Sequence, residues 1–240
     1  MTVGVLVYLA LWELAGRRGW LGTTFPPLSS IAAEMTGTAR RDVIVRAFRS
    51  TTGAASIGFL LGITVACAGA ALGLFVPPLR RGIDQLATIV HAVPIIPLTS
   101  LFVFTIGCGP TPMAIAALAA GFAMFVAATS AVEAARPLQH DMFTALGSGR
   151  FRRFTSLQLP AALPGLADGL RLAAPAALLG AVIGEWFGAP RGLGVLIVSA
   201  MQNYQIDLLW AAALLTALAS MLAFAVFTLL ARLAADRWTA

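Results

Sequence analysis

The sequence predicts an all-α membrane protein with about six transmembrane helices. The first observation behind this prediction is its composition: 59% of the 240 residues are hydrophobic and 11% are charged, whereas about a quarter of the residues of a soluble domain are charged. The second is a set of long uncharged stretches, clearest at residues 53–76 and 113–132. These are long enough to cross a bilayer, because a spanning helix needs about 20 mainly apolar residues.

Six stretches, taken in order, are expected to cross the membrane. The first is weakened by Glu13, Arg17 and Arg18. The third is expected to be kinked by Pro94 and Pro97, because proline lacks an N–H and disfavours a helical residue before it. The expected spans are residues 3–21, 53–76, 86–106, 113–132, 166–187 and 208–230.

The segments between the spans carry the turns and most of the charge. Residues 23–50 are expected to form a connector, with a proline turn into a short helix and then an amphipathic interfacial helix over residues 40–49. Residues 188–207 are expected to be a loop. We therefore divide the chain into two parts. Residues 1–52 are the N-terminal transmembrane helix and interfacial connector, and residues 53–240 are a core that contains a polar loop at residues 137–165.

The polar loop is the longest arginine-bearing interruption between the apolar stretches, and residues 141–164 read DMFTALGSGRFRRFTSLQLPAALP. Its pattern predicts two short helices with a break at Gly147, where a positive φ or a close approach requires glycine. Asp141 is expected to cap the first helix. Pro160 and Pro164 are expected to end the second. The second helix carries an apolar stripe at helical spacing: Phe151, Phe154 and Leu157. Two such helices favour docking to a cytosolic partner over a solvated linker.

All 16 basic residues are arginine, and the net charge is +6. The arginines are scattered singly or in pairs between apolar runs, which indicates anchoring at the membrane edge rather than nucleic-acid binding. Because the chain has no lysine, it has no Walker-type phosphate loop, and we expect it to bind no ATP in that way. Cys67 and Cys108 show neither metal-ligand spacing nor a disulfide framework, so no metal or other cofactor is expected.

Four residues are candidates for a translocation pathway or gate: His91, Pro94, Arg171 and Glu185. Ionisable groups are costly in lipid and usually face the interior of a helix bundle. Arg171 lies three residues after Asp168, and the pair either braces its helix or faces a pathway. Glu185 either closes a gate or reaches the interface. His91 either lines a cavity beside the proline kink or packs through a hydrogen bond.

The loop spacing resembles that of permease subunits of ATP-binding-cassette (ABC) importers, whose cytoplasmic loop reads Glu-Ala-Ala, three residues, Gly, nine residues, Ile, one residue, Leu-Pro. Gly147, Leu157, Leu159 and Pro160 stand at the Gly, Ile and Leu-Pro places. Residues 141–143 stand at the Glu-Ala-Ala place and share only its acid. A literal Glu133-Ala134-Ala135 lies 14 residues before Gly147 and is set aside.

Further motifs are similar to the sulfonate, nitrate and taurine branch of these permeases, and their order and spacing cover nearly the whole chain. They are Pro26-Pro27-Leu28-Ser29, residues 91–98, Phe104-Thr105-Ile106-Gly107 with Gly109, residues 169–173, Gly184-Glu185 and Gly192-Leu193-Gly194. The resemblance implies a type I importer permease fold with a cytoplasmic two-helix coupling loop. Its expected contacts to the ATPase are Asp141, Ala145, Gly147, Arg150, Phe151, Phe154, Leu157 and Pro160.

The resemblance also implies partners and a place in the cell. The expected partners are separate ATPase subunits that hydrolyse the ATP, an extracytoplasmic substrate-binding protein, a second copy of this chain and membrane lipid. The chain itself is expected not to be an enzyme. It is expected in the bacterial inner membrane with the polar loop and both chain ends in the cytosol. It is expected to carry a small solute by alternating access: a small organic anion such as a sulfonate, with nitrate, taurine or a thiamine precursor left open. An ion-coupled secondary transporter and a non-transporting membrane scaffold are the alternatives.

Overall fold

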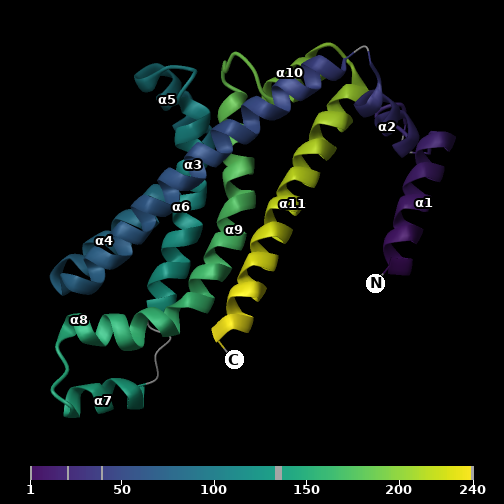
Figure 1. Ribbon diagram of the computed structural model, residues 1–240. Helices are drawn as coiled ribbons and strands as arrows, with labels where there is room; N and C mark the ends of the chain where they lie inside the picture. Colours follow the sequence, from purple (N-terminus) through teal and green to yellow (C-terminus); the bar gives the residue numbers. More distant parts are fainter. Residues whose placement is uncertain (1, 21, 39, 133–136, 239–240) are drawn as a thin grey trace.

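The computed structural model describes residues 2–20, 22–38, 40–132 and 137–238, and all regular secondary structure within these ranges is helical, as predicted (Figure 1). The helices follow in the order α1 (Thr2–Arg18), α2 (Leu28–Thr36), α3 (Arg41–Phe75), α4 (Pro77–Ala92), α5 (Ile95–Ile106), α6 (Thr111–Val132), α7 (Pro137–Ala145), α8 (Arg150–Arg153), the π-helical turn η1 (Phe154–Gln158), α9 (Leu159–Glu185), α10 (Leu193–Gln202) and α11 (Ile206–Trp238).

The core of the bundle is formed by α3, α6 and α9, and α11 packs against α9. Small residues bring these helices together, since the buried centre consists largely of alanines such as Ala116, Ala173 and Ala181. A Cβ added to Gly58 of α3 would lie 2.5 Å from the Cβ of Ala116 on α6. The close approach of α6 to α3 at Gly58 therefore requires glycine, because only a residue without a side chain fits there.

Four of the helical stretches are long and apolar enough to cross a membrane: α3, α6, residues 151–185 and residues 206–233. A fifth span results if α4 and α5, which are bent by 95° relative to each other, are taken together. The remaining predicted span, residues 3–21, corresponds to α1. This helix has 17 residues and ends on Arg17 and Arg18, so it is shorter and more charged than a typical span.

The bend between α4 and α5 has a local cause at Pro94. Val93, the residue before it, adopts an extended conformation with φ −68° and ψ 126°, which is the region that a following proline enforces. The predicted proline break is therefore present, and it is a sharp corner rather than a kink. Pro97 does not add to it, since it lies in the first turn of α5, where a backbone N–H has no helical partner to lose.

Two predicted connectors are more regular than expected. Residues 41–52 belong to α3, so the division proposed between residues 52 and 53 falls inside one continuous helix. This helix continues because Ile44, Ala47 and Thr51 are buried on the same face as the apolar part that follows. The stretch at residues 188–207, predicted to be a loop, contains α10.

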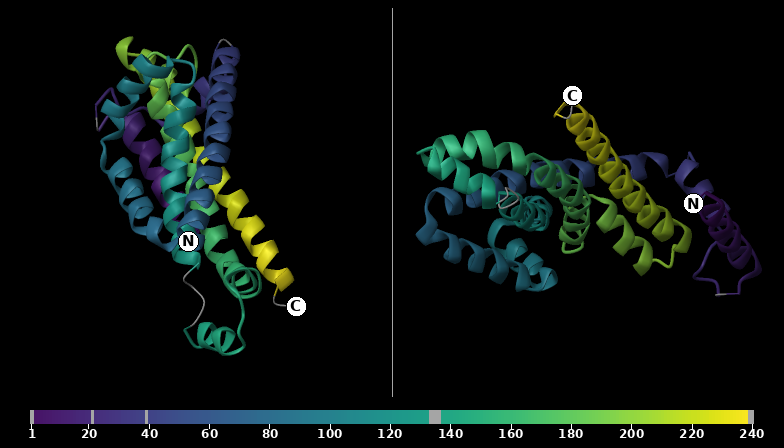
Figure 2. Two further views of the ribbon diagram at one scale, coloured as in Figure 1. Left: turned by 90° about the vertical axis from the view of Figure 1, so that its left-hand side faces the viewer. Right: turned by 90° about the horizontal axis from the view of Figure 1, so that it is seen from below.

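The bundle has two distinct ends. Helix α7 and the last turns of α11 lie at one end, and α10 with the turn after α5 lies at the other (Figures 1 and 2). We call these the α7 end and the α10 end. Helices α3 and α9 both extend from one end toward the other, so each is placed to carry a displacement along the length of the bundle.

Candidate functional site

The first helix of the polar loop, α7, projects beyond the α7 end of the bundle (Figure 1). It ends in a Schellman arrangement: the N–H of Gly147 donates to the carbonyl of Thr144 over 3.0 Å, and the N–H of Ser148 donates to that of Phe143 over 3.0 Å. Gly147 has φ +67°, and among the described residues no atom beyond its own chain neighbours lies within 4 Å of the position of an added Cβ. Within this chain, the positive φ rather than a close approach therefore accounts for the glycine.

Asp141 does not cap α7, contrary to the prediction. It is the fifth residue of a helix that begins at Pro137, so its carboxylate lies beyond the first-turn N–H groups that a capping side chain accepts from. Ala145 is the last residue of the helix and is exposed. The literal Glu133-Ala134-Ala135 lies outside the described residues.

Helix α7 carries an exposed apolar face that the sequence analysis did not single out. Leu138 and Met142 of α7 and Leu146, which directly follows its last residue, are spaced four residues apart, and they are 79%, 54% and 72% exposed. Residues at this spacing lie one above the other along a helix. This row of three side chains, here called the α7 face, is therefore open to a partner.

Pro160 and Pro164 do not end the second loop helix, contrary to the prediction. The chain remains helical from Arg150 through η1 into α9, with both prolines in the first turns of α9. In η1 the N–H of Leu159 donates to the carbonyl of Phe154, five residues back. This wider turn gives room for a proline ring, which in a regular helix meets the carbonyl four residues earlier. In Figure 1 the chain turns from α8, which lies across the α7 end, into the upright α9.

The predicted apolar stripe does not face one way. Phe151 is 73% exposed, but Leu157 is only 8% exposed. The ring of Phe154 packs edge-to-face on that of Phe75 at the end of α3, with the centroids 5.2 Å apart. Two of the three residues thus pack on the bundle, and Phe151 alone is available for docking. The side chain of Arg150 lies outside those described.

A hydrogen bond joins the two loop helices: Nη2 of Arg153 donates to the hydroxyl of Thr144 over 3.0 Å. Together with the Schellman arrangement and the packing of Phe154, it fixes α7 relative to α3 and α9. We call residues 137–158 the α7–η1 segment, or the arm. Its two helices are hydrogen-bonded to each other, and η1 packs on α3, so α7 is connected to the bundle by a folded segment rather than by an extended linker.

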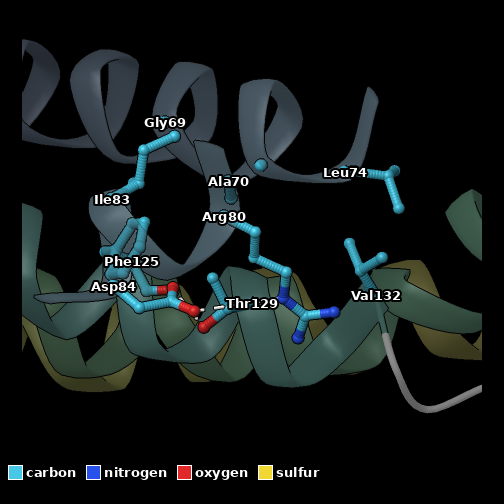
Figure 3. A pocket seen from close by; sticks show the side chains of 10 residues that line it. Gly69, Ala70, Leu74, Arg80, Ile83, Asp84, Phe125, Thr129 and Val132 are labelled. Carbon is cyan, nitrogen blue, oxygen red and sulfur yellow. Dashed lines mark hydrogen bonds and ion pairs between the residues drawn. The ribbon is translucent and has the colours of Figure 1, made fainter. Parts of the chain in front are cut away.

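A small hollow opens on α3, α4 and α6, near the end of α3 that contacts η1 (Figure 3). Arg80 and Asp84 line it from α4, and the guanidinium Nε of Arg80 lies 3.9 Å from Oδ2 of Asp84. The remaining lining is mostly apolar: Gly69, Ala70, Gly73, Leu74, Ile83, Phe125, Thr129 and Val132. None of the four candidate pathway residues lines this hollow.

Glu185, one of those candidates, is buried at the α10 end and is 1% exposed. The hydroxyl of Thr51 on α3 lies 2.8 Å and 3.0 Å from its two carboxylate oxygens, and the N–H of Gly194 donates to it over 2.8 Å. The N–H of Leu193 donates to the same Thr51 hydroxyl over 2.8 Å. We call these four residues the carboxylate cluster. It joins α3, α9 and the first turn of α10. The side chain of Glu185 is buried among these helices and does not extend into water, as the alternative of reaching the membrane–water interface would require.

Glycine is required beside this carboxylate. A Cβ added to Gly192, which has φ +148°, would overlap the carboxyl group of Glu185. The first N–H groups of a helix carry a partial positive charge, so the start of α10 suits a carboxylate. The sequence motifs at residues 184–185 and 192–194 pointed to this place. Thr51 was missed, because it stands in the polar run Arg49-Ser50-Thr51-Thr52, where the sequence does not distinguish one hydroxyl from its neighbours.

The other candidate pathway residues lie apart. Arg171 pairs with Asp168 over 3.2 Å, as the spacing predicted, and its guanidinium lies over the ring of Phe224 on α11. Fourteen residues of helix separate Arg171 from Glu185, or about 21 Å. The ring of His91 stacks on Phe122 of α6 with the centroids 3.6 Å apart, beside the Pro94 bend. The structure therefore does not gather these residues into one site.

The residues described contain no group of three or more histidine, cysteine, aspartate or glutamate side chains arranged to hold a metal ion. The candidate site is thus made of two parts at opposite ends of the bundle. One is an exposed apolar face on a folded arm, and the other is a buried hydrogen-bonded carboxylate.

Sequence comparisons identify the family. Residues 58–239 match the family described as "Binding-protein-dependent transport system inner membrane component". An ABC transporter permease protein of Haemophilus influenzae is 31% identical over 160 residues, which are 66% of this chain and 65% of that protein. The chain thus spans just under two thirds of the length of this relative.

Two further relatives carry names that include a substrate. ThiX of Halalkalibacterium halodurans, named as a formylaminopyrimidine transport permease, is 27% identical over 195 residues, covering 80% of this chain and 77% of that protein. SsuC of Bacillus subtilis, named for aliphatic sulfonates transport, is 24% identical over 233 residues, covering 94% and 83%. With a family match over more than half of its length, this chain belongs to the inner-membrane permease components of binding-protein-dependent ABC transporters and is a multi-pass protein of the inner membrane.

Proposed function

We propose that this chain, paired with a second copy of itself, forms the pathway through which an ATP-driven importer carries a small organic anion of the sulfonate class into the cell. One observation supports the coupling part of this proposal most directly: an exposed apolar face stands on a folded arm at one end of an apolar bundle. In this family the ATPase lies in a separate subunit, and the family implies ATPase and substrate-binding partners.

The α7 face fits a groove on a soluble subunit. A short helix with apolar residues one turn apart is a recurring docking element, which inserts its apolar side into a hydrophobic groove. Water-exposed leucine and methionine side chains gain free energy when a partner covers them. The exposed ring of Phe151 on α8 is a second candidate contact, because aromatic residues are enriched at the centres of interfaces.

The mechanism follows from the connection of the arm to the bundle. ATP binding on the partner closes the pair of ATPase subunits, and their grooves carry the two α7 helices with them. Because η1 continues into α9 and Phe154 packs on Phe75 of α3, both helices are displaced. The bundle then alternates between a state open to the cytosol and a state open to the binding protein, and the solute enters in the latter.

The substrate class rests on the relatives. SsuC aligns with nearly the whole chain, whereas ThiX aligns with four fifths of it at slightly higher identity. We favour a sulfonate because the alignment with SsuC covers more of the chain. Uptake assays distinguish the two substrates. They use a labelled alkanesulfonate and labelled formylaminopyrimidine, together with the binding protein whose gene lies nearest to the gene of this chain.

The coupling role is tested by Met142→Glu, which places a charge in the middle of the α7 face. We expect the chain to insert and melt normally, since Met142 is exposed, but to lose the ATPase subunit on purification. Met201→Glu is the matched control, because Met201 is a methionine of similar exposure that lies near the end of α10, at the opposite end of the bundle. Retention of the ATPase subunit by Met142→Glu at the level of the control would refute docking at the α7 face.

A further inference from the structure

The carboxylate cluster bonds three helices to one another at the α10 end. Thr51 of α3 donates to Glu185 of α9 and accepts from the N–H of Leu193 at the start of α10, while Gly194 of α10 donates to Glu185. Each of the three helices is thus hydrogen-bonded to the other two. Such a closed set differs from a single surface hydrogen bond, because no helix leaves it without breaking at least two bonds.

Separating these helices in place is unfavourable. Thr51 and Glu185 are both fully buried, and in the part of the chain that the structure describes no arginine forms an ion pair with Glu185. Opening the cluster without water would leave a carboxylate and two N–H groups buried and unpaired, which is costly for each group and most costly for the charged one. The three helices therefore favour moving together over sliding past one another.

The same two long helices meet the α7–η1 segment at their other ends. Phe75, the last residue of α3, packs on Phe154, and α9 follows η1 directly. A displacement of the arm thus enters both α3 and α9 at the α7 end. The carboxylate cluster ties these helices together about one bundle length away and attaches α10, which is too short to cross the membrane.

We propose that Glu185 and Thr51 are positioning residues that make α3, α9 and α10 move as one unit, so that displacement of the α7–η1 segment reaches the α10 end. This inference rests on the proposed coupling of the arm to an ATPase. It assigns Glu185 a role in transmission between the two ends of the bundle, and no contact with the solute. Under the proposed function the α10 end is the side that faces the substrate-binding protein. The position of α10 on that side therefore depends on the nucleotide that the ATPase subunits have bound.

The chain offers matched variants for a test. Thr51→Val removes the hydroxyl and keeps the shape, and Thr51→Ser restores the hydroxyl. Thr52→Val is the control, because within the described residues the hydroxyl of the adjacent Thr52 donates to backbone carbonyls of its own helix. In the assembled transporter we expect Thr51→Val to retain the ATPase subunit and the basal rate of ATP hydrolysis. The stimulation of this rate by substrate-loaded binding protein is expected to fall at least tenfold. Thr51→Ser and Thr52→Val are expected to behave as the unsubstituted chain.

A distance measurement tests the common movement directly and requires no change in the cluster. Spin labels are placed at Arg49→Cys on α3 and Ser199→Cys on α10, both exposed positions, in a chain in which Cys67 and Cys108 are replaced by alanine. The distance between the labels is expected to be the same without nucleotide and with ATP, and to become broad or nucleotide-dependent when Thr51→Val is added.

Two outcomes overturn the inference: a nucleotide-dependent distance in the chain with an intact cluster, or full stimulation in Thr51→Val. Should Thr51→Val fail to fold, the distance measurement on the intact cluster still decides the common movement. Failure of the unsubstituted chain to retain any ATPase subunit is a different result, since it would refute the proposed function itself.

Discussion

Phe151 and Phe154 allow docking and packing to be separated by two single substitutions three residues apart. Phe154 is partly buried against Phe75, whereas Phe151 projects into solvent. We predict that Phe154→Ala destabilises the isolated permease and that Phe151→Ala does not. The two changes remove the same side chain from the same helical stretch, so each serves as the control of the other.

The magnitude follows from the contacts of Phe154. Full burial of a phenylalanine side chain contributes about 1.5–3 kcal/mol, so partial burial contributes about 1–1.5 kcal/mol. The edge-to-face pair with Phe75 adds about 0.5–1.5 kcal/mol. The expected loss is therefore about 2 kcal/mol for Phe154→Ala. For a chain of this size that corresponds to a decrease of about 4–8 °C in the melting temperature.

The assay is thermal melting of the purified permease in detergent, without any partner, followed by retention of the ATPase subunit. Phe151→Ala is expected to melt within about 1 °C of the unsubstituted chain, because surface substitutions rarely change stability, and to bind the ATPase subunit more weakly. Equal melting temperatures for the two variants would contradict the packing of η1 on α3. Unchanged retention by Phe151→Ala would remove Phe151 from the docking surface.

Two further predictions concern the break in the loop and the orientation of the chain. Gly147→Ala forces a side chain into a conformation with φ +67°, which costs roughly 1–2 kcal/mol; we expect weaker retention of the ATPase subunit with unchanged melting of the bundle, and normal retention would contradict this. Ser148→Cys and Tyr204→Cys, each in a chain without Cys67 and Cys108, are expected to react with an impermeant thiol reagent only after permeabilisation and from outside intact cells, respectively. Labelling of Ser148→Cys in intact cells would reverse the proposed orientation.

The helical nature of the chain and most of its spans were predictable, because they depend on local properties of the sequence such as hydrophobic length and the positions of proline. Hydrophobic length gave α6 within two residues, and the rule that proline excludes a helical residue before it located the corner at Pro94. Gly147 was placed at the end of a helix for the same kind of local reason. The family match then confirmed the interpretation drawn from the loop spacing.

The sequence-based predictions were wrong where tertiary contacts determine the local structure. Pro160 was expected to end a helix, but η1 widens the turn before it, and the periodicity of the sequence does not reveal a π turn. The stripe of Phe151, Phe154 and Leu157 has helical spacing, yet spacing alone does not tell whether a face meets a partner or the protein's own core. The packing of Phe154 depends on Phe75 at the end of α3, which lies about 80 residues earlier in the chain.

The apolar face that does remain open is too small to hold a partner alone. Three exposed leucine and methionine side chains, each contributing about 1.5–3 kcal/mol when fully covered, give roughly 3–6 kcal/mol for the fraction that is exposed. Association itself costs about 4–15 kcal/mol in lost freedom of movement, so one α7 helix on one ATPase subunit would bind weakly or not at all. In the proposed dimer, two α7 helices meet a pair of ATPase subunits, and the second contact is made at a high effective concentration. The small docking face thus favours an assembly that requires both copies at once. Because a substitution on α7 is present in both copies of the dimer, a change of one side chain weakens two contacts and is expected to release the ATPase.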